Sequence, residues 1–361
     1  DGVLYNIFSP VDMFESDADK NEALEQLAFQ LMPLETNMTD TSVFFLTEGR
    51  KILTAAMITY YHQGMDFPQI CKRIISSSWS TLFSEIDQNG NYEAKQYINS
   101  FEGTNEKNIA GCKQACDSAL KLFATNSHVY NAIGREREGK EAFTPEQLEN
   151  KNIFVVIQDS KLELYEPLVH IITAQCMEYF SNRDNNNQHT ILMCLDEFAS
   201  FGHLEITPAL RKLRKKHVRI MVLTQSLADI DLIYGRDERM AMLNNFAYKI
   251  VLGCSDSDTQ EYFSRLIGEK EVYRKAVSKN GKQVTNTKTE AKERIVPPAE
   301  LARLGRHMIL LAEGRYYKLT KNYYFELDLW DRVKKCINNL SRIQEEDFSE
   351  KNTLSLTDEN K

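Results

Sequence analysis

The stretch that decides the fold runs from Thr190 to Ser226 and reads TILMCLDEFASFGHLEITPALRKLRKKHVRIMVLTQS. Its first apolar run, Ile191 to Leu195, stops at two adjacent acids, Asp196 and Glu197. A run of this kind is typical of a strand that is buried on both faces, as in a parallel sheet. A helical stretch follows, and a second apolar strand is expected from Val218 to Leu223.

Both predicted strands end in polar residues. Asp196 and Glu197 follow the first strand, and Gln225 and Ser226 follow the second. Because open α/β sheets bind ligands at the carboxyl ends of their strands, these side chains are expected to meet at one edge. An acidic pair after an apolar run, taken alone, fits a helix cap or a solvated turn equally well. The polar residues after the next strand favour a ligand site.

The arrangement suits phosphoryl transfer from a nucleoside triphosphate, where catalysis is mostly positioning and charge neutralisation. Asp196 is predicted to bind Mg²⁺ through its water shell, and Glu197 to polarise the attacking water. Gln225 is predicted to sense the γ-phosphate, and Ser226 completes the predicted nucleotide-binding set. The expected cofactors are therefore ATP and Mg²⁺.

Several motifs in the same order resemble a known family. LDEFASFGHLE (195–205) and LTQSLADIDLIYG (223–235) look like the Walker B segment and the following Q-S motif of type IV secretion coupling proteins of the VirD4/TraG/TraD type. YNIFSPVD (5–12), the segment 244–269 and the segment 295–325 match the same family. The resemblance covers most of residues 1 to 330.

The resemblance implies an α/β fold, with a RecA-like P-loop NTPase sheet domain that is interrupted by an all-α domain. We expect 1–43 and 131–330 to form the RecA-like part, which lacks its Walker A region. Residues 44–130, where apolar residues recur at helical spacing, are the expected all-α domain. Residues 331–361 lose their apolar content and are predicted to be a disordered tail.

The family also implies an activity and a set of partners. Its members are membrane-anchored homo-hexameric ATPases on the cytoplasmic side of the bacterial inner membrane. They link relaxase-bound single-stranded DNA, or a protein substrate, to secretion channel proteins. Relaxosome and accessory proteins are the expected partners. Two alternatives stay open: a DNA-pumping ATPase of the FtsK/HerA kind, and a non-catalytic module that recruits substrates through its helical domain.

A basic run from Arg211 to Arg219 contains no acid. Such a run is usually a solvated helix face. Basic residues of ring-forming ATPases of this type can also reach the nucleotide of the next subunit and stabilise charge in the transition state. By its spacing from Gln225, Arg214 is the first candidate for that role, and Arg236 is the second.

The sequence has no G-x-x-x-x-G-K-[ST] loop, whose amides and lysine would hold the phosphates. The resembled family places that loop upstream of the segment that matches 5–12. The chain is therefore expected to begin after it, and to hydrolyse little or no ATP alone.

Composition sets further limits. The formal net charge of −8 gives no overall basic field, so contacts with nucleic acid must come from local patches. Residues 271–294 contain seven Lys or Arg against three Glu, around an expected Asn-Gly turn at Asn280. This hairpin fits contact with a nucleic-acid backbone, and a solvated flexible hairpin equally well. No apolar run approaches the ~20 residues of a membrane span, so a soluble fragment is expected.

The remaining pattern is that of an α/β protein. A buried strand is expected at 153–157, a helix at 165–180 and a further strand at 248–254. Two closing strands are expected at 308–313 and 316–325. The seven cysteines are an odd number at irregular spacing, which indicates a reducing compartment, and Cys194 is expected in the core.

Overall fold

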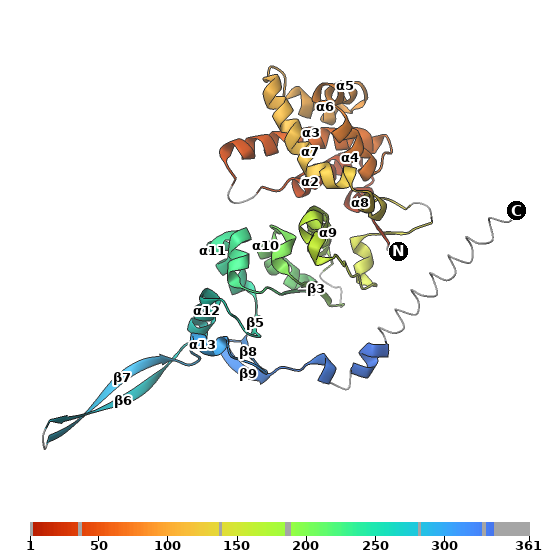
Figure 1. The fold of residues 1–361 in the computed structure, drawn as a ribbon. Coiled ribbons are helices and arrows are strands. Elements are labelled where there is room, and N and C mark those ends of the chain that lie inside the picture. Colours follow the sequence, from red (N-terminus) through yellow and green to blue (C-terminus); the bar gives the residue numbers. More distant parts are fainter. Residues whose placement is uncertain are drawn as a thin grey trace. The chain divides into compact units, whose positions relative to one another are not determined.

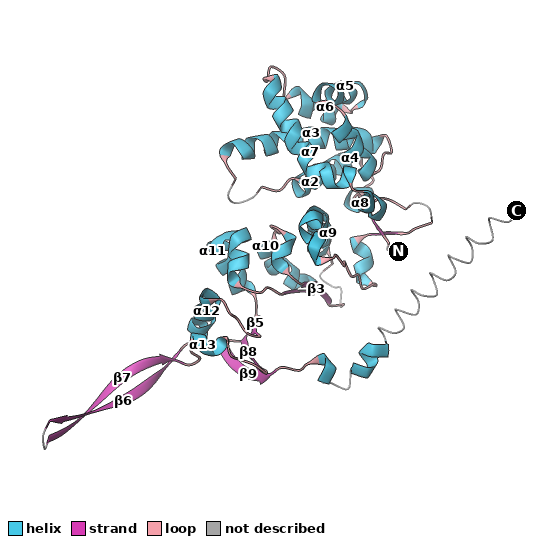
Figure 2. Cartoon of the chain, in the orientation of Figure 1, coloured by secondary structure: helices cyan, strands magenta, loops and turns pink. Residues whose placement is uncertain are grey.

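The computed structural model describes residues 3–34, 38–136, 139–184, 189–280, 283–326 and 330–335. The chain forms two compact units, Asp1–Phe246 and Ala247–Lys361. Helices predominate in the first unit, and antiparallel strands are prominent in the second (Figures 1 and 2). None of the described helices is both long and apolar enough to cross a bilayer.

The first unit begins with a short strand and a set of helices. They are β1 (Leu4–Tyr5), α1 (Ser9–Asp12), α2 (Asp17–Leu31), α3 (Asp40–His62), α4 (Phe67–Ser76), α5 (Trp79–Asn89), α6 (Tyr92–Asn99), α7 (Glu106–Thr125) and α8 (Ser127–Ala132). Helix α3 is the centre of this region and packs against α4, α6 and α7. Gly49 permits the close approach of α3 to α7, because a Cβ at this position would lie 2.7 Å from the carbonyl oxygen of Cys112.

The helices begin where the sequence supplies capping residues. Asp66 and Gln69 form a reciprocal capping box at the start of α4, and Pro68 occupies its first turn. Ser16 and Thr39 cap α2 and α3 in the ordinary way. The division into an all-α domain at 44–130 stays a prediction, although the helices from Asp40 to Ala132 follow one another without a strand.

The rest of the first unit alternates strands and helices. It contains β2 (Ala142–Phe143), the 3₁₀ turns η1 (Pro145–Glu149) and η2 (Asp159–Lys161), α9 (Leu162–Asn182), β3 (Ile191–Leu195), η3 (Phe198–Phe201), α10 (Ile206–Leu213), η4 (Arg214–Lys216), β4 (Val218–Val222) and α11 (Leu227–Asn245). Strands β3 and β4 are parallel, with Leu195 opposite Val222. The two predicted strands, their order and the helix between them are confirmed.

Two expectations about this sheet are wrong. Residues 153–157 form no strand, and Phe154 and Val156 are 85% and 87% exposed. A β segment needs a partner for its backbone groups, and among the described residues β4 is the only strand paired with β3. Cys194 is exposed, as is Leu192 on the same face of β3. Within the described residues the strand is therefore covered on one face only.

The second unit contains β5 (Tyr248–Val251), α12 (Ser257–Ile267), β6 (Glu269–Asn280), β7 (Gln283–Arg294), α13 (Pro298–Leu301), β8 (His307–Ala312), β9 (Arg315–Thr320) and η5 (Tyr324–Glu326). Strands β5, β8 and β9 form an antiparallel sheet, and β6 pairs with β7 in a long hairpin. The two closing strands are confirmed, although β9 ends at Thr320. The predicted turn extends into residues 281–282, which lie outside the described residues, as do 336–361 of the predicted tail.

Candidate functional site

The backbone brings the acidic pair and the following strand together. The parallel ladder continues beyond β3, where the Leu223 N–H donates to the Leu195 carbonyl at 3.0 Å. The chain then turns at the two acids, and the Phe198 N–H donates back to the Leu223 carbonyl at 2.9 Å. Asp196 and Glu197 therefore lie in a turn that is held on both sides by Leu223.

Gln225 reaches this turn from the end of β4. Its Nε2 lies 3.2 Å from Oε1 and 3.4 Å from Oε2 of Glu197, so the amide donates to the carboxylate. The Asp196 Oδ1 accepts from the Glu197 N–H at 3.1 Å. All three side chains are exposed. The expected meeting of the acidic pair and the amide at one edge of the sheet is thus a feature of the structure.

Glu197 has an unusual backbone conformation. Its φ of 51° and ψ of 50° are left-handed, which costs a residue with a Cβ about 1 kcal/mol or more. The next residue, Phe198, is completely buried and anchors the turn. The left-handed conformation is therefore held by the packing that follows it, and it aims the carboxylate toward Gln225.

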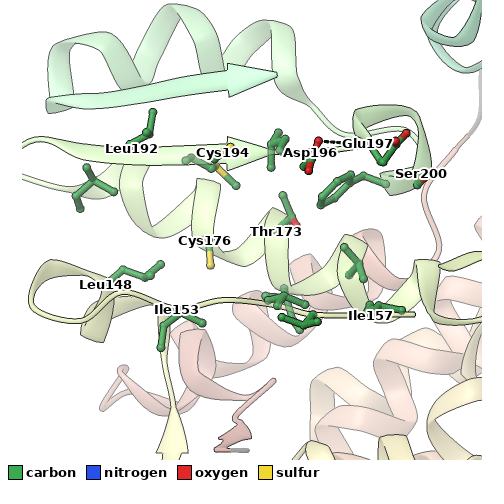
Figure 3. Close-up of a pocket in the computed structure, with 18 of the residues that line it drawn as sticks. Leu148, Ile153, Ile157, Thr173, Cys176, Leu192, Cys194, Asp196, Glu197 and Ser200 are labelled. Carbon is green, nitrogen blue, oxygen red and sulfur yellow. Dashed lines mark hydrogen bonds between the residues drawn. The ribbon is translucent and has the colours of Figure 1, made fainter. Parts of the chain in front are cut away.

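An apolar cavity of about 410 Å³ ends at the acidic pair. Figure 3 shows Leu192 and Cys194 of β3 on one side and Ile153 and Ile157 on the other. The cavity lies between β3 and residues 153–157, the segment that the sequence predicts to be a strand. The acids at its end give a polar rim to a hydrophobic space, as ligand sites commonly have.

Ser226 has a different role in the structure from the one predicted. Its Oγ accepts from the Asp229 N–H at 3.1 Å, and its own N–H donates to Asp229 Oδ2 at 3.1 Å. These two bonds form a capping box at the start of α11. Ser226 therefore fixes the helix that follows Gln225, and nucleotide binding by its side chain stays a prediction.

Sequence reasoning missed Tyr234, which supports the turn from behind. Its ring stacks on Phe198 with 5.5 Å between centroids and an interplanar angle of 9°. Its hydroxyl accepts from the Leu204 N–H at 3.0 Å and donates to the Gly202 carbonyl at 3.3 Å. Burial raises the pKa of this hydroxyl above its ordinary value. An available signal was its position four residues after Ile230, on the buried face of α11.

Two histidines lie behind the same loop. The ring of His203 packs against that of Tyr234 in a tilted arrangement with 4.8 Å between centroids, and its Nε2 lies 3.3 Å from Oε2 of Glu238. His170 on α9 is bonded to the backbone of Phe201. Burial lowers the pKa of His170, and the nearby His203 adds to that effect. These contacts join both histidines to the loop that follows the acidic pair.

The two predicted basic residues lie elsewhere in the chain. Arg214 begins η4, before the first residue of β4, whereas Gln225 follows the other end of that strand. A five-residue strand separates them by about 16 Å. Arg236 is exposed directly after Gly235, where the φ of 73° breaks α11. Among the described residues, neither arginine forms an ion pair with Asp196 or Glu197.

The residues present fit a magnesium site only in part. Mg²⁺ commonly takes one or two carboxylates, several waters and the phosphates of its substrate, and the exposed Asp196 and Glu197 suit that role. No group of three acidic, His or Cys ligands occurs among the described residues. The exposed acids therefore suit a metal that arrives with a nucleotide.

One segment comes near to a phosphate-binding loop. Residues 134–141 read GREREGKE, which matches G-x-x-x-x-G-K but has Glu141 where a Ser or Thr is required. A true loop links a strand to a helix, whereas this segment follows α8 and precedes β2. Asp66 also accepts from the Arg135 N–H at 3.1 Å. A carboxylate at this position would repel a phosphate.

A family model described as "Type IV secretory system Conjugative DNA transfer" matches residues 5–351. The chain belongs to that family. The match extends over both compact units and includes all the motifs discussed above. This confirms the family to which the sequence motifs point.

Curated members of the family are distant and longer. Protein VirD4 of Agrobacterium fabrum is 23% identical over 195 residues, which are 52% of this chain and 28% of that protein. Protein VirD4 of Rhizobium radiobacter is 24% identical over the same extent. The chain thus matches little more than a quarter of these relatives.

Solved structures of the plasmid coupling protein TrwB share the fold. The match to the unbound form has a TM-score of 0.70 at 20% identity. It covers 89% of this chain and 72% of the TrwB chain. The match to the complex of TrwB with ADP and Mg²⁺ has a TM-score of 0.65 at 19% identity. It covers 90% of this chain and 72% of the TrwB chain. The predicted fold class, a RecA-like α/β domain with an all-α domain, is therefore confirmed for this family member.

Proposed function

We propose that this chain carries the water-activating half of a coupling-protein ATPase site. The observation that supports it is the contact of Glu197 with Gln225 across the ends of β3 and β4, with Asp196 adjacent. A glutamate that is oriented by an amide from the next strand suits the activation of water. Because Gln225 lies between β4 and α11, its side-chain amide would connect a change at Glu197 to the backbone of these two elements.

Asp196 is the residue that would hold Mg²⁺ through its water shell. Bound Mg²⁺ would neutralise negative charge on the phosphates. The protein's own part is carried by Glu197, whose left-handed backbone and bond to Gln225 position a carboxylate for a water molecule. The site also needs a lysine-bearing phosphate loop, which this sequence does not contain.

The location of Arg214 supports a role between subunits. It lies at the amino end of β4, about 16 Å from the end that carries Gln225, so it does not serve the acidic pair of its own chain. In a homo-hexamer, the opposite edge of one subunit can face the nucleotide of the next. Arg214, and second Arg236, would there stabilise charge in the transition state.

The proposed biological role is the transfer of a substrate to a secretion channel. TrwB is described as a conjugative coupling protein, and the family model is one of conjugative DNA transfer. We infer that hydrolysis drives relaxase-bound single-stranded DNA, or a protein substrate, toward channel proteins. The relaxosome or accessory proteins would deliver that substrate at the cytoplasmic side of the inner membrane.

The decisive experiment replaces Glu197→Gln in the full-length protein as the cell makes it. Loss of the general base should lower Mg²⁺-dependent ATP turnover by about 10²-fold or more, whereas binding of a fluorescent ATP analogue should persist. Glu205→Gln, an exposed acid in the following loop, is the matched control and should keep the normal rate. Normal turnover by the Glu197 variant would refute the proposed function.

The arginines are tested in the same assay. Arg214→Ala is expected to lower turnover strongly, and Arg236→Ala to a smaller degree, without loss of nucleotide binding. Mixing the Arg214→Ala protein with the Glu197→Gln protein should restore part of the activity, because each variant can supply the group that the other lacks. Normal rates in both single variants would remove these residues from the proposed site.

A further inference from the structure

The segment 5–12, YNIFSPVD, has no place in the proposed site, although it is one of the matching motifs. It lies where the chain enters the helical region, α2 to α8. The chain leaves that region at Ile133, and Tyr5 forms a parallel bridge with Ile133. The Gly134 N–H also donates to the Tyr5 carbonyl at 2.9 Å. Both crossings of the chain therefore meet at Tyr5.

Asp12 closes this junction from the other end of the segment. Its carboxylate accepts from the Tyr61 hydroxyl at 2.7 Å, from Asn6 Nδ2 at 2.9 Å and from Arg135 Nη2 at 2.7 Å. Tyr61 belongs to α3, and Arg135 follows α8. Burial acts to raise the pKa of Asp12, but these bonds outweigh it, so the pKa lies below its ordinary value. The segment 5–12 is thus fixed to the helical region by a charged carboxylate.

Gln175 joins the same segment to α9. Its side chain is buried, with 1% of the residue exposed. The Tyr5 hydroxyl donates to its Oε1 at 2.6 Å, and its Nε2 donates to the Ile7 carbonyl at 2.9 Å. Apolar packing has no preferred direction, whereas a hydrogen bond restricts both distance and angle. The amide therefore fixes the position of α9 along its axis more narrowly than an apolar side chain would.

The same helix contacts the loop that follows the acidic pair. His170 lies five residues before Gln175, about 8 Å along the helix axis, and is bonded to the backbone of Phe201. Glu166 lies one turn earlier, against Gly202, where a Cβ would be 2.1 Å from Oε1. Helix α9 therefore extends from the segment 5–12 to this loop and contacts both.

A short turn connects the loop to Glu197. Phe201 is the last residue of η3, which begins directly after Glu197. The Ser200 N–H donates to the Glu197 carbonyl at 2.8 Å. Energetic coupling between separate sites can be carried by contiguous rigid elements and hydrogen bonds. Such contacts run here from Gln175 through α9 and Phe201 to Glu197.

We infer that Gln175 is a positioning residue for the water-activating site, because it sets the place of α9 and thereby that of η3 and Glu197. This inference rests on the proposed function and deepens it, since it names a route by which the helical region acts on Glu197. A displacement of about 1 Å at a reacting group can cost about 10²-fold in rate. The buried amide thus has a consequence for the reaction beyond its contribution to packing.

The first test uses Gln175→Leu in the full-length protein. This change keeps the approximate size of the side chain and removes both bonds. The kcat for Mg²⁺-dependent ATP turnover should fall about ten-fold or more, whereas KM should stay within about two-fold because the groups that bind ATP are unchanged. Tyr5→Phe removes one of the bonds and should have a smaller effect. The double variant Tyr5→Phe, Gln175→Leu should match Gln175→Leu alone, because the shared bond is already absent.

The second test measures the loop directly, by hydrogen exchange in the 361-residue chain without nucleotide. The amides of Phe198 and Ser200 are both hydrogen-bonded in the loop. They should exchange about ten-fold faster or more in Gln175→Leu, because local opening becomes easier. Leu82→Ala, which removes a buried side chain of α5, is the control for lost stability in both tests. It should keep kcat and should affect these two amides less.

The outcomes separate this inference from the proposed function. A normal kcat in Gln175→Leu would overturn the inference, and so would loop exchange no faster than in Leu82→Ala. A raised KM with unchanged kcat would also overturn it, since the effect would then lie in nucleotide binding. If Glu197→Gln abolishes turnover while Gln175→Leu leaves exchange unchanged, only the positioning role fails. Normal turnover by Glu197→Gln refutes the proposed function, whatever the exchange rates are.

Discussion

At the scale of single residues, the site depends on backbone conformations that few residues adopt. Glu197 is one of three non-glycine residues with positive φ in the described chain. Gly202, with a φ of 67°, permits the loop to pass Glu166, whose Oε1 would lie 2.1 Å from a Cβ. Such strain persists only where the surrounding structure determines it. Here Phe198 and Tyr234 supply that support.

The hydroxyl of Tyr234 can be tested directly. Tyr234→Phe keeps the ring and its stacking on Phe198, but leaves the buried N–H of Leu204 without its acceptor. The expected loss in the free energy of unfolding is about 1–3 kcal/mol, measured by urea denaturation of the chain. Tyr92→Phe, at an exposed tyrosine, should change it by less than about 0.5 kcal/mol. Equal stability of both variants would contradict the supporting role.

At the scale of elements, a buried ion pair joins three segments around the sheet. Arg183 after α9 donates to both carboxylate oxygens of Glu149 at 2.6 and 2.7 Å, and also to the Lys216 carbonyl at 2.6 Å. Its side chain is 2% exposed. The contact fixes η1 and the start of β4 relative to α9. It thereby helps to set the strand that delivers Gln225.

Glu149→Ala should destabilise the chain more than an ordinary surface change. A buried guanidinium without its partner costs about 3–5 kcal/mol, observable as a lower urea midpoint. The double variant Glu149→Leu, Arg183→Met should lose less than the single one, because apolar replacements remove both charges together. Glu141→Ala, which breaks an exposed pair with Lys151, is the control. A double variant that is less stable than the single one would contradict this account.

At the scale of the whole molecule, the chain forms two compact units. The acidic pair and Gln225 both belong to the first, and the β6–β7 hairpin belongs to the second. The residues of the proposed nucleotide chemistry therefore all lie within one unit.

The 361-residue chain alone is expected to hydrolyse little or no ATP, even with Mg²⁺ in excess. Two carboxylates and an amide can position water and a metal, but nothing in the sequence matches the loop whose amides and lysine hold the phosphates. Phosphate release from the purified chain, followed over time, measures this. Turnover above the rate of the Glu197→Gln form of the same chain would show that the phosphates are held in another way.

The sequence by itself determined the elements and the family. Apolar runs that end in polar residues defined β3 and β4, because this signal depends on neighbours in the chain. The meeting of Glu197 and Gln225 also followed, since parallel strands end at a common edge.

Only the tertiary structure decided which faces of the β3–β4 sheet are covered. Residues 153–157 have the composition of a strand, yet they form none, because a strand requires a paired neighbour that the segment itself cannot specify. The sequence placed Tyr234 at helical spacing from Ile230, but its stacking on Phe198 and its hydrogen bonds to the loop at 202–204 appear only in the folded chain. Each depends on contacts between residues that are distant in the chain, and these arise only when the backbone folds.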